Sequence, residues 1–524
     1  MSHRVRTEHA TIHGLFDEQA ARTPDRTALR DARESLTYAE TRRRADALAA
    51  RLHQHCPRPG ARIGLRLERG VRMVVAMLAV LKCGHTYVPL DPAYPAERLR
   101  RMALDAEPAL ILTDQDLADD VPPAAEARPP EVAVTPDAPA YVLYTSGASG
   151  PPNAVPVPHR NVLALVRACG ERYELGAEDV WTSLHSFAFH LSVWEIWGAL
   201  LRGGTLVVVP REVAASPRAT LDLLARERVT VLTAVPSVFR HLVRATAAWV
   251  GEVPVPRHVF LASEPIDIRD IRCWRRAFGT ASRFVSTYAL TEATCFAAHR
   301  PLTDEELDGT QPPEPLADLG EPLEGVELAV LGEGGQPIRP GEIGEIHLSG
   351  AGLATGRPTE RYHRTGDLAR MRGDGRLYYA GRVEDEVRTN GPRFGLGEVE
   401  TVLRQAPGVR ELVVVTTSSG VGEPMMTAFY TVRTSAQVDL GTRLSAHARA
   451  ELPVHMAPTR FVRLPELPIS PSGRTDRAAL AAWRPPIQTV LPSTLRAPRL
   501  PDALPGHSPM SSWSRRVAGS SGRR

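Results

Sequence analysis

Short, continuously apolar segments recur along the chain, and stretches with helical spacing separate them. These segments lie at 63–65, 109–112, 140–144, 205–209 and 229–232. Because their apolar residues run together instead of alternating with polar ones, they are typical of strands that are buried on both faces. Strands of this kind, interleaved with helices, predict an α/β fold with mainly parallel sheets.

The pattern changes after about residue 383. A helical pattern at 396–405 is followed by strand-like segments at 409–415 and 426–434, a helical pattern at 440–452 and a strand-like segment at 461–464. This succession predicts a compact α+β unit of roughly 100 residues, which is a common domain size.

Three parts of the chain are therefore expected. Residues 1–383 are predicted to form a large N-terminal domain, which begins with helices between 12 and 56 that a short strand at 35–38 divides. Residues 384–483 are predicted to form the small C-terminal domain. Residues 484–524 are rich in proline, serine and arginine without periodicity, so we expect a disordered tail.

Charge and cysteine content exclude several classes of protein. The 63 basic and 60 acidic residues give a formal net charge of +3, and they are interspersed, which argues against nucleic-acid binding. The five cysteines include no CxxC pair, so neither a zinc site nor a disulfide framework is expected. No apolar run is long enough for a signal peptide or a membrane span, and we expect a cytoplasmic protein without membrane contact.

A glycine- and hydroxyl-rich segment directly follows the apolar run at 140–144. Its sequence over 144–152 is YTSGASGPP. Small residues of this kind let backbone N–H groups and hydroxyls approach phosphate oxygens closely. The segment lacks the Gly-Lys-Ser/Thr ending of a Walker loop, and a simple connection between strand and helix is the alternative interpretation.

Further motifs follow one another in a fixed order around this segment. They lie at 36–40, 81–91, 144–152, 187–195, 287–292, 344–350, 364–368, 381–400, 452–458 and 471–477. In order and content they resemble the core motifs of the adenylation domains of nonribosomal peptide synthetases, within the acyl-adenylate-forming superfamily of AMP-binding enzymes. The resemblance extends from about residue 15 to residue 480.

The resemblance implies a two-domain fold with a small, mobile C-terminal domain that rotates about a hinge near Glu384. It also implies a reaction in which a carboxylate attacks the α-phosphate of ATP, giving an acyl-adenylate and pyrophosphate. The acyl group then passes to the phosphopantetheine thiol of a separate carrier protein. The implied cofactors are ATP and Mg²⁺, and the implied partners are a small-molecule acid, the carrier protein and an MbtH-like helper protein. Because 504–508 resembles a carrier attachment sequence but lacks the helices of a carrier, we expect a stand-alone domain whose acceptor comes in trans.

Such chemistry needs aligned reactants and stabilised phosphate charge more than covalent catalysis. By resemblance, Tyr288 stacks on adenine, Asp367 accepts hydrogen bonds from the ribose hydroxyls and Arg382 lies near ribose or phosphate. The predicted nucleotide-binding residues are Thr145, Ser146, Gly147, Ser149, Gly150, Tyr288, Thr291, Asp367 and Arg382. The predicted catalytic residues are Arg474, Thr145 and Glu292, and Glu292 is also the expected magnesium ligand.

A second set of residues is expected to line the pocket for the acid. By motif alignment these are His190, Leu191, Trp194, Thr233, Phe260, Ala262, Thr287, Cys295 and Phe296. The aromatic side chains in this set suggest a cramped pocket with few polar groups, which favours a small or flat acid.

Several positions depart from the family pattern, among them Ala289, Leu290, Asn390 and Gly395. His190 stands where an aspartate usually pairs with the α-ammonium group of an amino acid. The substrate is expected to be a small carboxylic or amino acid, and an acid without an α-amine, or with its amine elsewhere, becomes plausible. Arg474 stands in the place of the family's catalytic lysine, and Asn153 in that of a lysine after the phosphate loop. Lys82 is the single lysine of the chain and occupies neither place.

These departures leave two further interpretations open. A catalytically impaired homologue would serve as a binding partner or scaffold for another synthetase. Alternatively, an enzyme that keeps the adenylation step would pass the acyl group to an amine, which makes it an amide ligase.

Overall fold

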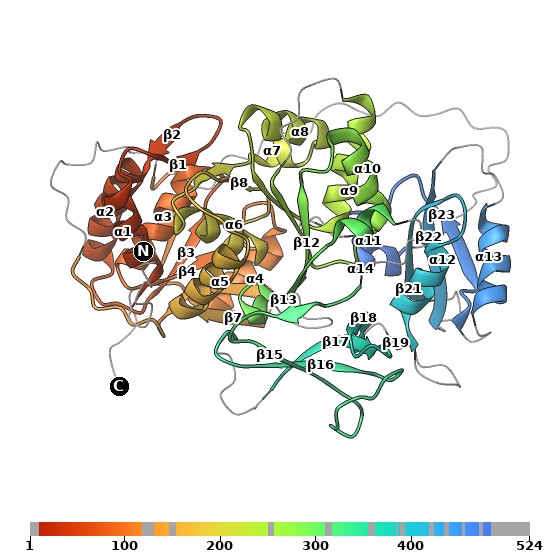
Figure 1. Cartoon of the computed structure of the whole chain (residues 1–524). Helices are drawn as coiled ribbons and strands as arrows, with labels where there is room; N and C mark the ends of the chain where they lie inside the picture. Colours follow the sequence, from red (N-terminus) through yellow and green to blue (C-terminus); the bar gives the residue numbers. More distant parts are fainter. Residues whose placement is uncertain are drawn as a thin grey trace, which may run out of the picture. The chain divides into compact units, whose positions relative to one another are not determined.

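The structure is a computed structural model, and Figure 1 shows its course. It describes residues 10–117, 130–145, 153–249, 256–309, 317–354, 362–383, 386–387, 394–418, 424–433, 440–452, 456–470 and 475–483. Residues as far as Ala482 belong to one compact unit. None of the described helices is both long enough and apolar enough to cross a membrane.

A five-stranded sheet lies in the first part of the chain. Its strands are β3 (Arg62–Arg66), β4 (Thr86–Pro89), β5 (Leu110–Thr113), β6 (Pro139–Thr145) and β7 (Asn153–Pro158). They are arranged in the order β5-β3-β4-β6-β7, and all neighbours are parallel except β6 and β7. Helices α3 (Val71–Lys82) and α4 (Ala96–Ala106) connect parallel strands of this sheet.

A nine-stranded sheet follows, in the order β14-β13-β12-β11-β10-β8-β9-β1-β2. Its strands are β1 (Thr27–Arg30), β2 (Ser35–Thr37), β8 (Val180–Ser183), β9 (Thr205–Val208), β10 (Val231–Ala234), β11 (His258–Ala262), β12 (Arg283–Ala289), β13 (Phe296–Pro301) and β14 (Glu321–Pro322). The central run from β1 to β12 is parallel, and the edges are antiparallel.

Helices surround these two sheets. They are α1 (Ile12–Arg22), α2 (Tyr38–His55), α5 (His159–Arg172), α6 (Leu191–Leu200), α7 (Arg211–Ala214), α8 (Pro217–Arg226), α9 (Pro236–Ala245), α10 (Ile268–Phe278) and α11 (Asp304–Asp308), with 3₁₀ turns η2 (Thr246–Ala248) and η3 (Thr291–Ala293). Side chains from α1, α2, α3, α5 and α6 share one buried apolar cluster with strands of both sheets. Most residues of the continuous apolar segments are buried, except in the edge strand β5, where Leu110 and Ile111 are half-buried. The predicted α/β fold with mainly parallel sheets is confirmed.

Two smaller sheets and a short ribbon complete the described chain. The strands are β15 (Glu327–Leu331), β16 (Ile343–Ser349), β17 (His363–Met371), β18 (Leu377–Arg382), β19 (Glu386–Val387), β20 (Phe394–Gly395), β21 (Val409–Ser418), β22 (Pro424–Val432) and β23 (Arg460–Arg463). Helices α12 (Leu396–Arg404) and α13 (Leu440–Glu451) cover the β21-β22-β23 sheet through a separate apolar core, and α14 (Arg477–Ala481) ends the unit. The α+β character expected of this region is confirmed. The domain boundaries remain predictions, and the expected hinge residue Glu384 and tail 484–524 lie outside the described residues.

The first motif of the sequence has a local structural role at the start of α2. The Thr37 hydroxyl accepts a hydrogen bond from the backbone N–H of Glu40, and the Glu40 carboxylate accepts one from the N–H of Thr37. This capping box satisfies two N–H groups that the helix cannot pair. The hydrogen bond from the Thr37 N–H to the carboxylate is the main cause that lowers the pKa of Glu40.

The single lysine of the chain joins the first three helices. The Nζ atom of Lys82 in α3 lies 2.6 Å from a carboxylate oxygen of Asp17 in α1 and 2.8 Å from one of Asp46 in α2. The Lys82 side chain is only 3% exposed. Two carboxylates thus compensate a buried ammonium group, so the lysine at this position has a structural role.

Candidate active site

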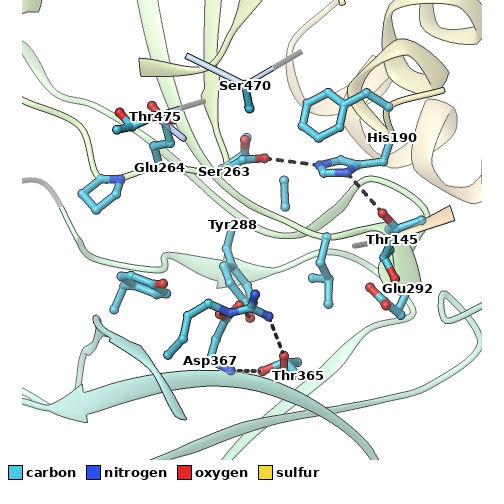
Figure 2. Close-up of a pocket in the computed structure, with 18 of the residues that line it drawn as sticks. Thr145, His190, Ser263, Glu264, Tyr288, Glu292, Thr365, Asp367, Ser470 and Thr475 are labelled. Carbon is cyan, nitrogen blue, oxygen red and sulfur yellow. Dashed lines mark hydrogen bonds and ion pairs between the residues drawn. The ribbon is translucent and has the colours of Figure 1, made fainter. Parts of the chain in front are cut away.

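A cavity of about 580 Å³ opens where several strands end. Thr145 is the last residue of β6, His190 precedes α6, and Thr287, Tyr288 and Ala289 end β12. Ligands of parallel α/β sheets bind at the carboxyl ends of the strands, and the cavity has that location. Figure 2 shows His190 and Ser263 in one part of the cavity and Asp367 with Thr365 in another.

The structure brings many predicted site residues together around this cavity. Those that line it are Thr145, His190, Thr287, Tyr288, Thr291, Glu292, Asp367 and Arg382. Others lie outside the described residues, namely Ser146, Gly147, Ser149, Gly150 and Arg474. Thr475, which follows Arg474 in the sequence, is a lining residue.

The predicted nucleotide residues form a hydrogen-bonded group. The hydroxyl of Tyr288 donates to Oδ2 of Asp367 at 2.7 Å, and Nε of Arg382 donates to Oδ1 at 2.9 Å. The Thr365 hydroxyl accepts from the Asp367 N–H at 3.0 Å. Burial, followed by the neighbouring Asp367 carboxylate, raises the pKa of Tyr288 well above its usual range. Tyr288 is therefore a neutral donor that orients the carboxylate.

His190 is held between two hydroxyl groups. Its Nε2 atom lies 3.2 Å from Oγ of Ser263, and its Nδ1 atom lies 3.3 Å from Oγ1 of Thr291. Ser263 has φ of 72°, a left-handed conformation that is rare for residues other than glycine. His190 is 3% exposed. The cavity therefore presents, at this point, an oriented imidazole and no negatively charged group in the position of residue 190.

Seven predicted acyl-pocket residues do not line the cavity. They are Leu191, Trp194, Thr233, Phe260, Ala262, Cys295 and Phe296, all at most 1% exposed. The rings of Trp194, Phe260 and Phe296 pack together, with centroid separations of 5.4 to 6.2 Å. Nε1 of Trp194 and Oγ1 of Thr233 are buried without a hydrogen-bond partner in the described part of the chain. Buried polar atoms of this kind call for an explanation, such as a water or a ligand.

The comparison with known families and proteins agrees with this geometry. The profile of the AMP-binding enzyme family matches residues 16–356, and that of the AMP-binding enzyme C-terminal domain matches residues 398–474. The chain is 33% identical to syringomycin synthase SyrB1 of Pseudomonas syringae, with 90% of this chain and 81% of the relative covered. It belongs to the AMP-binding enzyme family.

Longer relatives and solved structures place this AMP-binding enzyme among the adenylation-type domains. It is 36% identical to a dimodular nonribosomal peptide synthase of Bacillus subtilis, with 90% of this chain covered but only 22% of the relative. Among solved structures, a four-domain nonribosomal peptide synthetase bound to AMP and glycine has a TM-score of 0.75 and 28% identity, over 94% of this chain and 37% of that one. The structure of Klebsiella oxytoca NpsA has a TM-score of 0.76 at 24% identity, over 90% of this chain and 98% of that one. This likeness shows that the two proteins share a fold. The predicted resemblance to such domains is confirmed, and membership indicates an ATP-dependent, AMP-forming ligase.

The cavity of this AMP-binding enzyme offers ligands suited to magnesium. Glu292 in η3 and Thr145 at the end of β6 both line it and carry oxygen donors. Mg²⁺ usually takes one or two protein oxygens and completes its shell with water and phosphate. No group of three or more His, Cys, Asp or Glu side chains capable of holding a metal occurs among the described residues. The donor set fits a magnesium ion bound together with a nucleotide.

Sequence reasoning missed several lining residues, including Tyr94, Arg98, Ser263 and Thr365. Ser263 follows Ala262, which was predicted, but its hydroxyl contact with His190 spans 73 positions. Arg98 is one of three arginines near the start of α4. Arg100 and Arg101 lie three and four residues after Glu97, a spacing that favours pairing with it, whereas Arg98 lies next to Glu97, but this spacing does not predict a place in the cavity. Asn153, at the start of β7, is exposed and is not a described lining residue.

Proposed function

We propose that this AMP-binding enzyme activates a small or flat carboxylic acid that lacks an α-ammonium group. A carboxylate oxygen forms a bond to the α-phosphorus of ATP. The bond between that phosphorus and the oxygen bridging to the β-phosphate breaks, and pyrophosphate leaves with the electron pair. The acyl group of the resulting adenylate then passes to the phosphopantetheine thiol of a carrier protein, with AMP as the leaving group.

The observation that carries the choice of acid is the arrangement at His190. An imidazole is neutral or positively charged, so it cannot supply the negative partner that an α-ammonium group needs. The hydroxyls of Ser263 and Thr291, at 3.2 and 3.3 Å, occupy both ring nitrogens, so the position presents a fixed imidazole and two hydroxyl groups in place of a carboxylate.

Two buried polar atoms support a polar group elsewhere on the acid. Trp194 Nε1 can only donate a hydrogen bond, and the Thr233 hydroxyl can donate or accept. Both atoms lack hydrogen-bond partners among the described residues. Thr233 in β10 is paired with Phe260 in β11, and the Phe260 ring packs on Trp194. An oxygen of the acid that reaches either atom would satisfy its hydrogen-bonding capacity.

Several chain residues have assigned parts in this proposal. Tyr288, Asp367 and Arg382 hold the nucleoside, and Arg474 aligns the carboxylate with the α-phosphate. Thr145 and Glu292 hold magnesium, which when bound neutralises phosphate charge. A protein of the MbtH-like class is the proposed helper.

ATP–pyrophosphate exchange with matched panels of acids tests the proposal. The wild-type protein, with and without an MbtH-like helper, is assayed with α-hydroxy, α-keto and aryl acids and with α-amino acids of similar size. We expect exchange with members of the first three classes and little with amino acids. In the His190→Asp variant we expect a gain with α-amino acids, and His190→Asn, which adds no charge, is the matched control.

Two outcomes would contradict the proposal. Exchange confined to α-amino acids would exclude the assigned substrate class, whereas no exchange with any acid would favour a non-catalytic scaffold. Mass spectrometry of a phosphopantetheinylated carrier then tests the transfer step. Amide formation with free amines, without carrier acylation, would assign an amide ligase instead.

A further inference from the structure

Arg98 differs from its neighbours at the start of α4. Glu97 accepts hydrogen bonds from Arg100 at 2.8 Å and from Arg101 at 2.9 Å, and these side chains are exposed. Arg98 instead lines the cavity, with its guanidinium 5.1 Å from the centre of the Tyr94 ring. Its Nε atom is buried and has no hydrogen-bond partner in the described part of the chain. Its cationic group is therefore available to a ligand in the cavity.

The topology places Arg98 beyond the end of β6. Helix α4 connects parallel strands, so it runs against them and begins at their carboxyl edge. Farther along the helix, Asp105 accepts a hydrogen bond of 2.7 Å from Tyr144, the residue before the end of β6. Arg98 lies seven residues earlier, about two turns and 10 Å along the same helical face. Arg98 therefore lies beyond the carboxyl end of β6, the strand that segment 146–152 follows in the sequence.

A side-chain cation in this part of the cavity would add to magnesium in holding phosphate groups. Segment 144–153 contains no lysine or arginine. Two other arginines among the described lining residues are already paired, because Arg382 donates to Asp367 and Arg477 donates to Glu400 at 2.6 Å. Lys82 is held by Asp17 and Asp46. Arg98 is thus the cavity arginine that no described carboxylate neutralises.

We propose that Arg98 binds the outer phosphate oxygens of the nucleotide and stabilises pyrophosphate as it leaves. This inference rests on the proposed adenylation activity. A guanidinium can donate two parallel hydrogen bonds to phosphate, and the Tyr94 ring beneath it holds its plane. The charge that develops on the leaving group is then met by a preplaced cation.

Binding and exchange measurements on the full chain test this role. The variants are Arg98→Gln and Arg98→Lys, with Arg101→Gln as a control from the same helix. Binding constants for ATP, AMP and inorganic pyrophosphate are measured by calorimetry, and KM for pyrophosphate is measured in the exchange reaction. We expect Arg98→Gln to weaken ATP and pyrophosphate binding about 10- to 100-fold, with partial recovery in Arg98→Lys and AMP binding within about twofold of wild type. Arg101→Gln should match wild type throughout.

The outcomes separate this inference from the function on which it rests. Wild-type exchange combined with unchanged ATP and pyrophosphate constants in Arg98→Gln would overturn the role of Arg98 and leave the adenylation activity intact. A raised KM for the acid alone would also overturn it, because Arg98 would then serve the carboxylate. A wild-type protein that neither binds ATP nor exchanges pyrophosphate would overturn both. Equal loss of AMP and ATP binding in both Arg98 variants would indicate a structural role and would likewise overturn the inference.

Discussion

The Nε2 atom of His190 lies 3.2 Å from the hydroxyl of Ser263, and the serine makes this contact from a left-handed backbone conformation. An L-residue in that conformation has a cost of about 1–2 kcal/mol, which glycine does not bear. Strain of this kind persists where the surrounding structure holds it, and it often marks a functional site. The pair therefore links backbone strain to the orientation of the imidazole in the cavity.

Replacing Ser263 should separate stability from activity. We expect Ser263→Gly to raise the free energy of unfolding by about 1 kcal/mol and to lower kcat/KM for the acid, because His190 loses a hydroxyl partner. Ser263→Ala keeps the strained backbone and should lose activity without gaining stability. Denaturant unfolding and exchange kinetics check the two effects, and a glycine variant with full activity would contradict the role of the hydroxyl.

Replacing Tyr288 by phenylalanine should weaken nucleotide binding selectively. The ring remains, but Asp367 loses the hydrogen bond of 2.7 Å that orients its carboxylate. A hydrogen bond to a charged group contributes about 1.5–3 kcal/mol, so KM for ATP should rise about tenfold or more while KM for the acid changes little. Tyr378, which packs under Arg372 and is not a described lining residue, provides the control variant Tyr378→Phe. An equal rise in both KM values would argue against a specific effect on the nucleotide.

Removing the buried ammonium of Lys82 should destabilise the fold. In Lys82→Met, the carboxylates of Asp17 and Asp46 would lose their close cation and keep only Arg42, whose Nε atom lies 3.7 Å from each. Breaking a buried ion pair from one side costs about 3–5 kcal/mol. Denaturant unfolding measures this loss, and a triple variant that also carries Asp17→Asn and Asp46→Asn should recover part of it. No recovery in the triple variant would place the loss in packing rather than in unpaired charge.

Acid should destabilise the contact between α1 and α5. The rings of His13 and His159 lie edge to face at 5.6 Å. Burial lowers the pKa of His13 to about 4 and that of His159 to about 3. Both values lie below the ordinary histidine pKa of about 6.5, so the unfolded chain binds protons that the folded one does not. The stabilising contribution is complete above pH of about 6.5 and is lost as the pH falls toward 4 and 3.

The variant His159→Gln tests this pH dependence. Between about pH 6.5 and pH 4, its free energy of unfolding should fall less steeply than that of the wild type. The two slopes should differ by up to about 1.4 kcal/mol per pH unit for each proton that the variant no longer binds. His55 is exposed, and His55→Gln should follow the wild-type curve. Parallel curves for His159→Gln and the wild type would contradict the assignment.

Local patterns in the sequence were sufficient for several elements of the fold. The run at 140–144 became β6, and the pattern at 396–405 became α12, because apolar spacing over a few residues decides which faces are buried. The pair Thr37 and Glu40 needed only each other to form a capping box. The ordered motifs also predicted eight of the residues that line the cavity, because these residues occupy motif positions of the family that the chain resembles.

Tertiary structure alone decided which of these residues meet and which are closed off. Tyr288 and Asp367 are 79 positions apart in the sequence, and the packing of the sheets brings the Tyr288 hydroxyl to 2.7 Å from Oδ2 of Asp367. The seven acyl-pocket residues away from the cavity are packed because their neighbours come from β10, β11, α6 and the start of β13, which no local spacing relates. The helical spacing from Glu97 accounts for the pairing of Arg101, but only the position of α4 against β6 puts Arg98 in the cavity. The sequence by itself thus determined the elements, the family and much of the chemistry, whereas the packing of distant elements decided the contacts and charges of the site, because these depend on neighbours that the chain order does not specify.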